Sequence, residues 1–170
     1  AAIQKAYQKP SYRYLVLGIL TTVYVSNFVD RQVINVLAQP IIEDLNISDG
    51  QFGMLSGLAF AFIYTTLAVP IARWADISNR RNIVAASVAI WSVMTALCGA
   101  AQSFAQLFLA RFGVGIGEAG GSPPSHSIVS DIFPAEQRAT ALSIYSLGVY
   151  GGILVGTCLL YTSPSPRDRQ

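Results

Sequence analysis

Residues 82–101 read NIVAASVAIWSVMTALCGAA, a stretch without Asp, Glu, Lys or Arg. A helix needs about 20 mostly apolar residues to cross roughly 30 Å of hydrocarbon, so this stretch is typical of a membrane span. The whole chain shares its character, because 52% of the 170 residues are hydrophobic and only 12% are charged. Soluble domains carry about 25% charged residues. The deficit indicates a chain whose solvent is largely lipid.

Four further apolar segments flank this stretch, at 14–37, 51–73, 104–129 and from 139 to at least 157. We therefore expect an all-α membrane protein with five transmembrane helices. They occupy a partial bundle over residues 14–157, preceded by a short segment over residues 1–13. The pair Pro123-Pro124 predicts a break or kink in the fourth helix, because proline removes a backbone donor and clashes with the preceding turn.

The basic residues predict the orientation of these helices. Alternate connections carry Lys and Arg, whereas the other two carry none and the first of them is acidic. The basic set is Lys5, Lys9 and Arg13 before the first helix, Arg73, Arg80 and Arg81 after the second, and Arg138 after the fourth; the acidic set is Glu43, Asp44 and Asp49. Because positive residues stay on the cytoplasmic side, we expect a multi-pass protein of the cell (inner) membrane with a cytoplasmic N-terminus.

Other classes of function find little support in the residues. The net charge of +2 is too small to indicate nucleic-acid binding. Neither Cys98 nor Cys158 has metal-like spacing, and His126 lacks co-ligands, so we expect no metal and no cofactor. The G-x-G-x-x-G match at 115–120 lies inside an apolar segment without a βαβ context, which favours close helix packing over dinucleotide binding. An intramembrane enzyme using Glu118 and His126 is an alternative, but we expect no enzyme because neither a nucleophile elbow nor an HExxH pattern is present.

Four charged residues interrupt the first and fourth segments: Asp30, Arg31, Arg111 and Glu118. Such residues cost about 2.5–3.5 kcal/mol each at a helix centre and usually face a partner or a cavity. Asp30 and Arg111 each lie about 10 Å from the outer end of their helix, so we expect them to pair. Glu118 lies two turns deeper than Arg111 on nearly the same face. Arg31 points about 100° away from Asp30 and should serve another partner or the substrate.

These charges are typical of a protonation switch. Burial disfavours the ionised form of a carboxyl group and a nearby cation favours it, so a moving arginine would load or release a proton. We interpret Asp30 and Glu118 as proton-coupling residues, and Arg31 and Arg111 as substrate or charge-pair residues. The alternative is a static ion pair that orients the first and fourth helices.

Three motifs resemble those of the major facilitator superfamily. The loop over residues 72–81 resembles the family motif G-x-x-x-D-R-x-G-R-R; Asp76, Arg80 and Arg81 match it, while Ala72, Ile77 and Asn79 depart from it. The fourth helix has the family's arginine motif at Leu107, Arg111 and Gly115, and the fifth is similar to its glycine-rich motif at Gly148, Gly151, Gly152 and Gly156. The resemblance implies that Asp76, Arg80 and Arg81 form a cytoplasmic gate loop.

Within the superfamily the chain resembles the Spinster branch. The likeness lies in Asp30-Arg31, in 115–119 of the fourth helix, in Asp131-x-Phe133 and in Gln137-Arg138. It implies twelve helices in two halves with the substrate held between them, of which this chain supplies helices one to five. The implied function is secondary active transport of a small organic or lipid-like solute by alternating access, coupled to protons. The partners would be that solute, protons, the lipid bilayer and the remaining half of the same chain. The alternatives are an organic-anion symporter of another branch and a non-transporting receptor or scaffold.

The last residues have a different character. The run CLLYTSPSPRD at 158–168 resembles, letter for letter, the translation of a sequencing-library adapter. We therefore interpret residues 158–170 as non-native read-through and leave them out of the functional argument.

Overall fold

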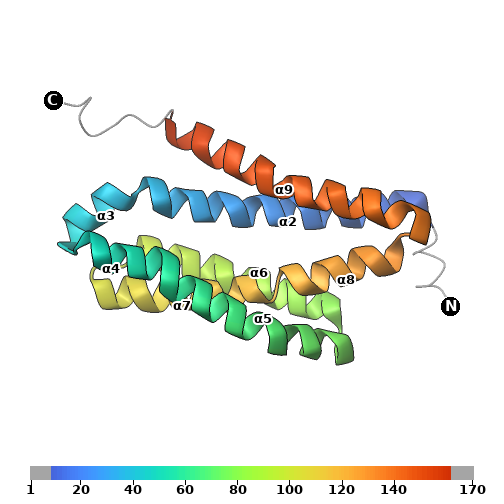
Figure 1. Ribbon diagram of the computed structural model, residues 1–170, viewed down its shortest axis with the longest axis horizontal. Coiled ribbons are helices and arrows are strands. Elements are labelled where there is room, and N and C mark those ends of the chain that lie inside the picture. The colour runs from blue at the N-terminus through green and yellow to red at the C-terminus, as the bar shows by residue number, and fades with distance from the viewer. Residues whose placement is uncertain (1–8, 162–170) are drawn as a thin grey trace.

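The computed structural model describes residues 9–161, and every regular element in that range is helical. The elements are α2 Pro10–Val36, α3 Ala38–Leu45, α4 Asp49–Gly53, the π-helical turn η1 Met54–Leu58, α5 Ala59–Ile77, α6 Arg80–Gly99, α7 Phe104–Ala119, α8 Ser122–Ile132 and α9 Ala135–Tyr161 (Figure 1). Residues 1–8 lie outside this range, as do residues 162–170 of the expected read-through.

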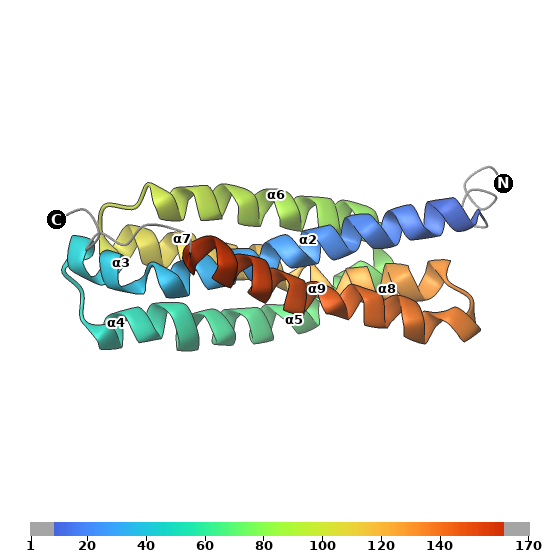
Figure 2. The same cartoon turned by 90° about the horizontal axis from the view of Figure 1, so that it is seen from above.

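The helices of the described range 9–161 form five rods, and each corresponds to one predicted segment. The rods are α2, the continuous run α4-η1-α5, α6, the pair α7–α8, and α9. Helix α9 lies along α2, while α5, α6, α7 and α8 build the rest of the bundle (Figures 1 and 2). We call one end the basic end, because Arg13, Arg80 and Arg138 lie near it, and the opposite end, with α3, the acidic end.

By length and composition, only some of the five predicted transmembrane helices qualify as membrane spans among the described residues. Three of them are long and apolar enough to cross a membrane: Asp49–Ile77, Arg80–Gly99 and Ala135–Cys158. Asp30 and Arg31 lower the hydropathy of α2, and the fourth rod is divided into helices of 16 and 11 residues. The same charges and the same break that indicate function therefore weaken the membrane signal of these two rods.

The break in the fourth rod was predicted by its proline pair and is confirmed. Helix α7 ends at Ala119 and α8 begins at Ser122, so the break lies at Gly120-Gly121, directly before Pro123-Pro124. Proline is tolerated in the first turn of a helix, where its missing N–H would have no partner. The prolines thus mark where α8 starts. The π-helical turn η1 in the second rod was not predicted, because its sequence is ordinary and apolar.

Close packing by small residues, expected from the G-x-G-x-x-G match, is confirmed. A Cβ atom added at Gly117 would lie 2.7 Å from the backbone nitrogen of Trp91, and one at Gly120 would overlap the Ser87 hydroxyl. A side chain at Gly117 would require the α6 backbone to move, and one at Gly120 would displace the Ser87 hydroxyl. The match therefore reflects the contact between α6 and α7.

A second glycine seam joins α9 to α2. Gly148, Gly152 and Gly156 recur every four residues on one side of α9. An added Cβ at Gly152 would lie 2.5 Å from the Phe28 Cβ and 2.6 Å from the Val25 carbonyl oxygen. These glycines let the two backbones approach, as small residues do in membrane helix pairs.

We expect Gly152→Ala to destabilise the full-length protein by about 1–3 kcal/mol, because the new methyl group overpacks the α2–α9 seam. Gly151→Ala is the matched control, since its Cβ would meet Val25 at an ordinary 3.6 Å. Both substitutions gain the same helix propensity, so their difference isolates the clash. Thermal unfolding of the purified protein in detergent measures it, and equal melting temperatures for the two variants would contradict the close approach.

Candidate functional site

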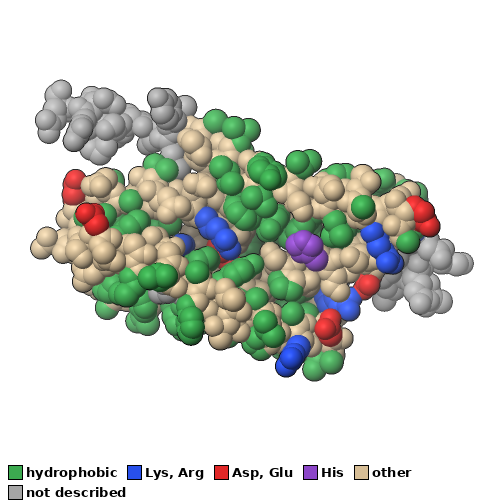
Figure 3. Space-filling view, in the orientation of Figure 1, with side chains coloured by type: hydrophobic (Ala, Val, Ile, Leu, Met, Phe, Trp, Pro, Cys, Tyr) green, Lys and Arg blue, Asp and Glu red, His purple; other side chains and the backbone are tan. Residues whose placement is uncertain are grey.

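The four charged residues of α2 and α7 lie in the middle of the bundle, away from both ends. On the face shown in Figure 3, charged side chains gather at the two ends, and a basic group lies near the centre among hydrophobic side chains. Glu118 is 2% exposed and Arg111 is 6% exposed, so both are inside the protein. Charged groups at such positions need partners, because burial removes their hydration.

Glu118 finds its partner on α2 in Arg31. The Arg31 side chain donates from Nε and from an Nη atom to the same carboxylate oxygen, Oε2, at 2.8 and 2.6 Å. Hydrogen bonds between two charged groups are the strong ones. The other oxygen of Glu118, Oε1, is buried and has no hydrogen-bond partner among the described residues. The acid is therefore neutralised by one cation but only half satisfied.

Aromatic rings surround the Arg31 guanidinium. Its central carbon lies 5.1 Å from the Phe28 and Phe60 ring centroids and 5.3 Å from that of Tyr64. A ring face attracts a cation by about 0.5–2 kcal/mol. The Arg31 side chain nevertheless stays 29% exposed.

Asp30 does not pair with Arg111, contrary to expectation. Its carboxylate instead accepts a hydrogen bond from Trp91 Nε1 of α6 at 3.0 Å. Residue counts give the depth of a side chain along a helix, but they do not give the rotation of that helix about its axis. In the structure α2 directs Arg31 toward α7 and Asp30 toward α6, because neighbouring residues point about 100° apart. Arg31, which had no assigned partner, thus binds the acid of α7.

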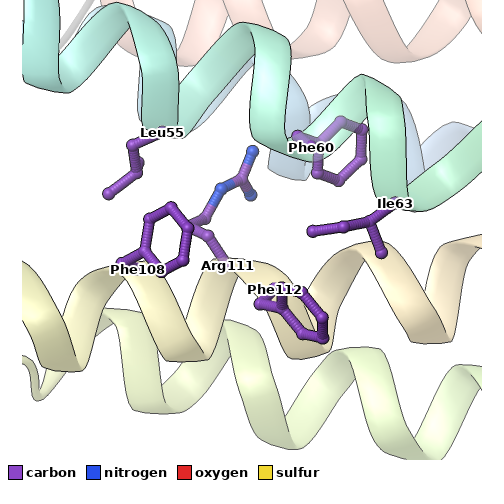
Figure 4. A pocket seen from close by; sticks show the side chains of 6 residues that line it. All are labelled: Leu55, Phe60, Ile63, Phe108, Arg111 and Phe112. Carbon is purple, nitrogen blue, oxygen red and sulfur yellow. The ribbon is translucent and has the colours of Figure 1, made fainter.

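Arg111 is a buried cation that forms no ion pair within the described part of the chain. Its Nε has no hydrogen-bond partner among the described residues, and its guanidinium carbon lies 5.1 Å from the Phe60 ring centroid. Figure 4 shows its side chain rising from α7 toward the second rod, between Leu55 and Phe60. The surrounding pocket is otherwise apolar and is lined by Leu55, Phe60, Ile63, Phe108 and Phe112.

The predicted gate loop lies at the basic end, far from these charges along the rods. Arg80 bonds to Asp131 of α8 and lies 3.9 Å from Asp76, while Arg81 is exposed. Asn79, where the family motif has glycine, caps α6 by accepting a hydrogen bond from the Arg81 backbone nitrogen at 3.2 Å. The turn therefore forms without a glycine. The gating role of this loop stays a prediction.

Two site residues were missed from the sequence. Trp91 carried a usable signal, since it stands in the middle of the 82–101 segment whereas membrane tryptophans favour the interfaces. Phe60 carried none, because a phenylalanine is ordinary in an apolar helix. His126 takes no part in this site; its ring packs edge-on against Tyr145 at 4.9 Å, and its Nδ1 lies 2.9 Å from the Ser122 carbonyl oxygen.

Comparisons with known proteins show which family the chain resembles. The profile of the Major Facilitator Superfamily matches residues 20–162. An "MFS-type efflux pump" of Mycolicibacterium smegmatis is 37% identical over 82% of this chain and 33% of its own length. A "Probable galactarate/D-glucarate transporter" of Bacillus subtilis is 28% identical over 94% of this chain and 36% of its own. The chain thus spans about a third of the length of these curated relatives.

A solved structure is similar as well. It is a bacterial homologue of the human lysosomal transporter Spinster in an inward-facing and occupied conformation, with 50% sequence identity and a TM-score of 0.83. The match covers 88% of this chain and 32% of that one.

We expect Arg31→Gln to destabilise the full-length protein by about 3–5 kcal/mol at alkaline pH, because it leaves Glu118 charged and buried without its cation. Acidic pH should reduce the loss by neutralising the carboxyl group, and Arg31→Gln with Glu118→Gln should recover most of it. Arg81→Gln, at an exposed position, is the control. Thermal unfolding at both pH values is the measurement; a loss at Arg31 no larger than at Arg81 would show that the pair is unimportant.

Proposed function

The chain belongs to the major facilitator superfamily, and we propose that the full-length protein is a proton-coupled secondary active transporter of a small organic or lipid-like solute. The observation that carries this proposal is the buried Arg31–Glu118 pair in the middle of the bundle. Major facilitator proteins hold their substrate near mid-membrane between two halves. A half-satisfied acid at that depth is well placed to exchange a proton while the solute moves.

Glu118 is the proposed main proton carrier. When Arg31 moves away, Glu118 is left in an apolar environment that disfavours its charge, so it takes up a proton. When Arg31 returns, the cation favours the ionised form and the proton leaves. The arginine that binds Glu118 is thus Arg31 of α2, whereas the sequence had suggested that Arg111 pairs with Asp30. Asp30, held by Trp91, is the proposed second proton site.

The proposed solute class follows from the relatives and from Arg31. The names of the relatives include an efflux pump and a sugar-acid transporter, and the similar structure is a Spinster homologue. Because the Arg31 guanidinium is partly exposed, an anionic group of a solute can reach it. Organic-anion symport is therefore the second candidate, and the test separates the two by using two solutes.

The experiment uses the full-length protein in vesicles that contain a pH-sensitive dye, with D-glucarate in one arm and a lysophospholipid in the other. We expect one solute to move together with protons and to accumulate when a pH gradient is imposed. Asp30→Asn and Glu118→Gln should each abolish that accumulation, because neither amide can carry the proton, while solute exchange survives. Glu43→Gln, at an exposed position of α3, should behave as wild type.

Each outcome of this experiment has a separate meaning. Solute movement without proton movement in the wild type would leave transport standing and refute the coupling. Accumulation at wild-type levels in both acid variants would make these acids structural. Movement of neither solute would contradict the proposed substrate class.

We also propose that the basic end faces the cytoplasm, because it collects the Lys and Arg residues of the connections. Arg81→Cys and Asp49→Cys, both at exposed positions, test this in a full-length protein whose Cys98 is replaced. A membrane-impermeant thiol reagent should label position 49 on intact cells and position 81 only in inverted vesicles. The opposite pattern would reverse the orientation.

A further inference from the structure

We infer that Phe60 is a positioning residue that separates Arg111 from Glu118 and so leaves the acid to Arg31. The consequence for transport rests on the proposed function, but the separation itself does not. Arg111 Nε and Glu118 Oε1 are both buried without hydrogen-bond partners among the described residues, although both side chains project from α7.

Helix geometry allows these two groups to approach each other. Residues seven apart lie about 10.5 Å apart along the axis and on nearly the same face. Their long side chains can lean toward each other if the helix surface between them is free. A direct ion pair would satisfy both buried groups, and an unpaired buried charged group is costly. Something must therefore stand between them.

The position between them on that face is Gly115, four residues after Arg111 and three before Glu118. Two side chains of α5 pack over Gly115, since a Cβ added there would lie 3.5 Å from Ile63 Cγ2 and 3.5 Å from Phe60 Cδ2, both ordinary contact distances. The Phe60 ring, together with Ile63, therefore covers the helix surface between the arginine and the acid.

The ring also binds both arginines. The guanidinium carbons of Arg31 and Arg111 each lie 5.1 Å from the Phe60 centroid. Its electron-rich face attracts each cation and so holds Arg111 on the ring rather than on the carboxylate. Phe60 is itself only 9% exposed and is packed in the core, so it does not swing aside freely.

Loss of the ring should change the partner of Glu118. With Phe60→Leu the position stays apolar, but the π face and the far part of the ring are gone. Arg111 then reaches Glu118 and neutralises it permanently. The proton affinity of Glu118 no longer depends on the movement of Arg31, so the coupling of solute to proton is lost.

The first test measures the separation without using transport. The melting temperature of the full-length protein in detergent is measured for Arg111→Gln, for Glu118→Gln and for the double variant. The interaction between the two side chains is the difference between the shift of the double variant and the sum of the two single shifts. We expect little interaction with Phe60 present. In the Phe60→Leu background, or Phe60→Met where the leucine variant does not fold, we expect it to rise to about 3 °C or more. Phe60→Tyr, which keeps the ring, should leave it low.

Phe62→Leu is the matched control, because Phe62 lies on the same helix and is 72% exposed. An interaction between positions 111 and 118 that is the same with and without the aromatic ring would overturn the inference, whatever the transport assay shows.

The second test uses the solute that the wild type transports, D-glucarate or the lysophospholipid. Phe60→Leu should reduce gradient-driven accumulation about tenfold while exchange continues, and Phe60→Tyr and Phe62→Leu should not. Undiminished accumulation in Phe60→Leu would overturn the consequence for coupling. If the wild type itself shows no proton-driven accumulation, the proposed function fails, and the melting series still decides the role of Phe60.

Discussion

The buried carboxylate of Glu118 needs a cation, and the packing at the centre of this bundle depends on that need. An ionised acid inside an apolar protein is tolerated only with a cation at hydrogen-bond distance, and Arg31 supplies it from the neighbouring rod. That cation needs support in turn, which the rings of Phe28, Phe60 and Tyr64 provide. One charged atom pair thus explains why aromatic side chains from two rods converge at this depth.

Glycines make that convergence possible. Gly117, next to Glu118, brings the backbone of α6 against α7, and this contact places Trp91 where its indole reaches Asp30. Phe60 and Ile63 of α5 pack against α7 at Gly115. The two acids and two arginines, which all come from α2 and α7, therefore occupy one compact region.

Hydrophobic length and proline position predict the rods and the break in the fourth, because both depend on local properties of the chain. The depth of the four charges follows from the rise per residue. The partners of these charges cannot be predicted in this way, because pairing depends on the rotation of each helix about its axis, which tertiary packing sets. A rotation of α2 by about 100° decides whether Asp30 or Arg31 faces α7. Phe60 could not have been identified among other apolar residues, whereas the central position of Trp91 was an available signal.

The break at Gly120-Gly121 gives the fourth rod a mechanical property. Just beyond the acid, Gly120 and Gly121 donate to carbonyls three residues back, at Gly117 and Glu118, instead of continuing the α-helical ladder. Bending stiffness should therefore drop between Glu118 and the α8 segment that carries Asp131, the partner of Arg80. The rod then consists of two helical segments, α7 and α8, that are connected by a flexible hinge. Tilting of α8 at one end of the protein need not shear the buried ion pair, so large movements there can proceed while the charged centre keeps its geometry.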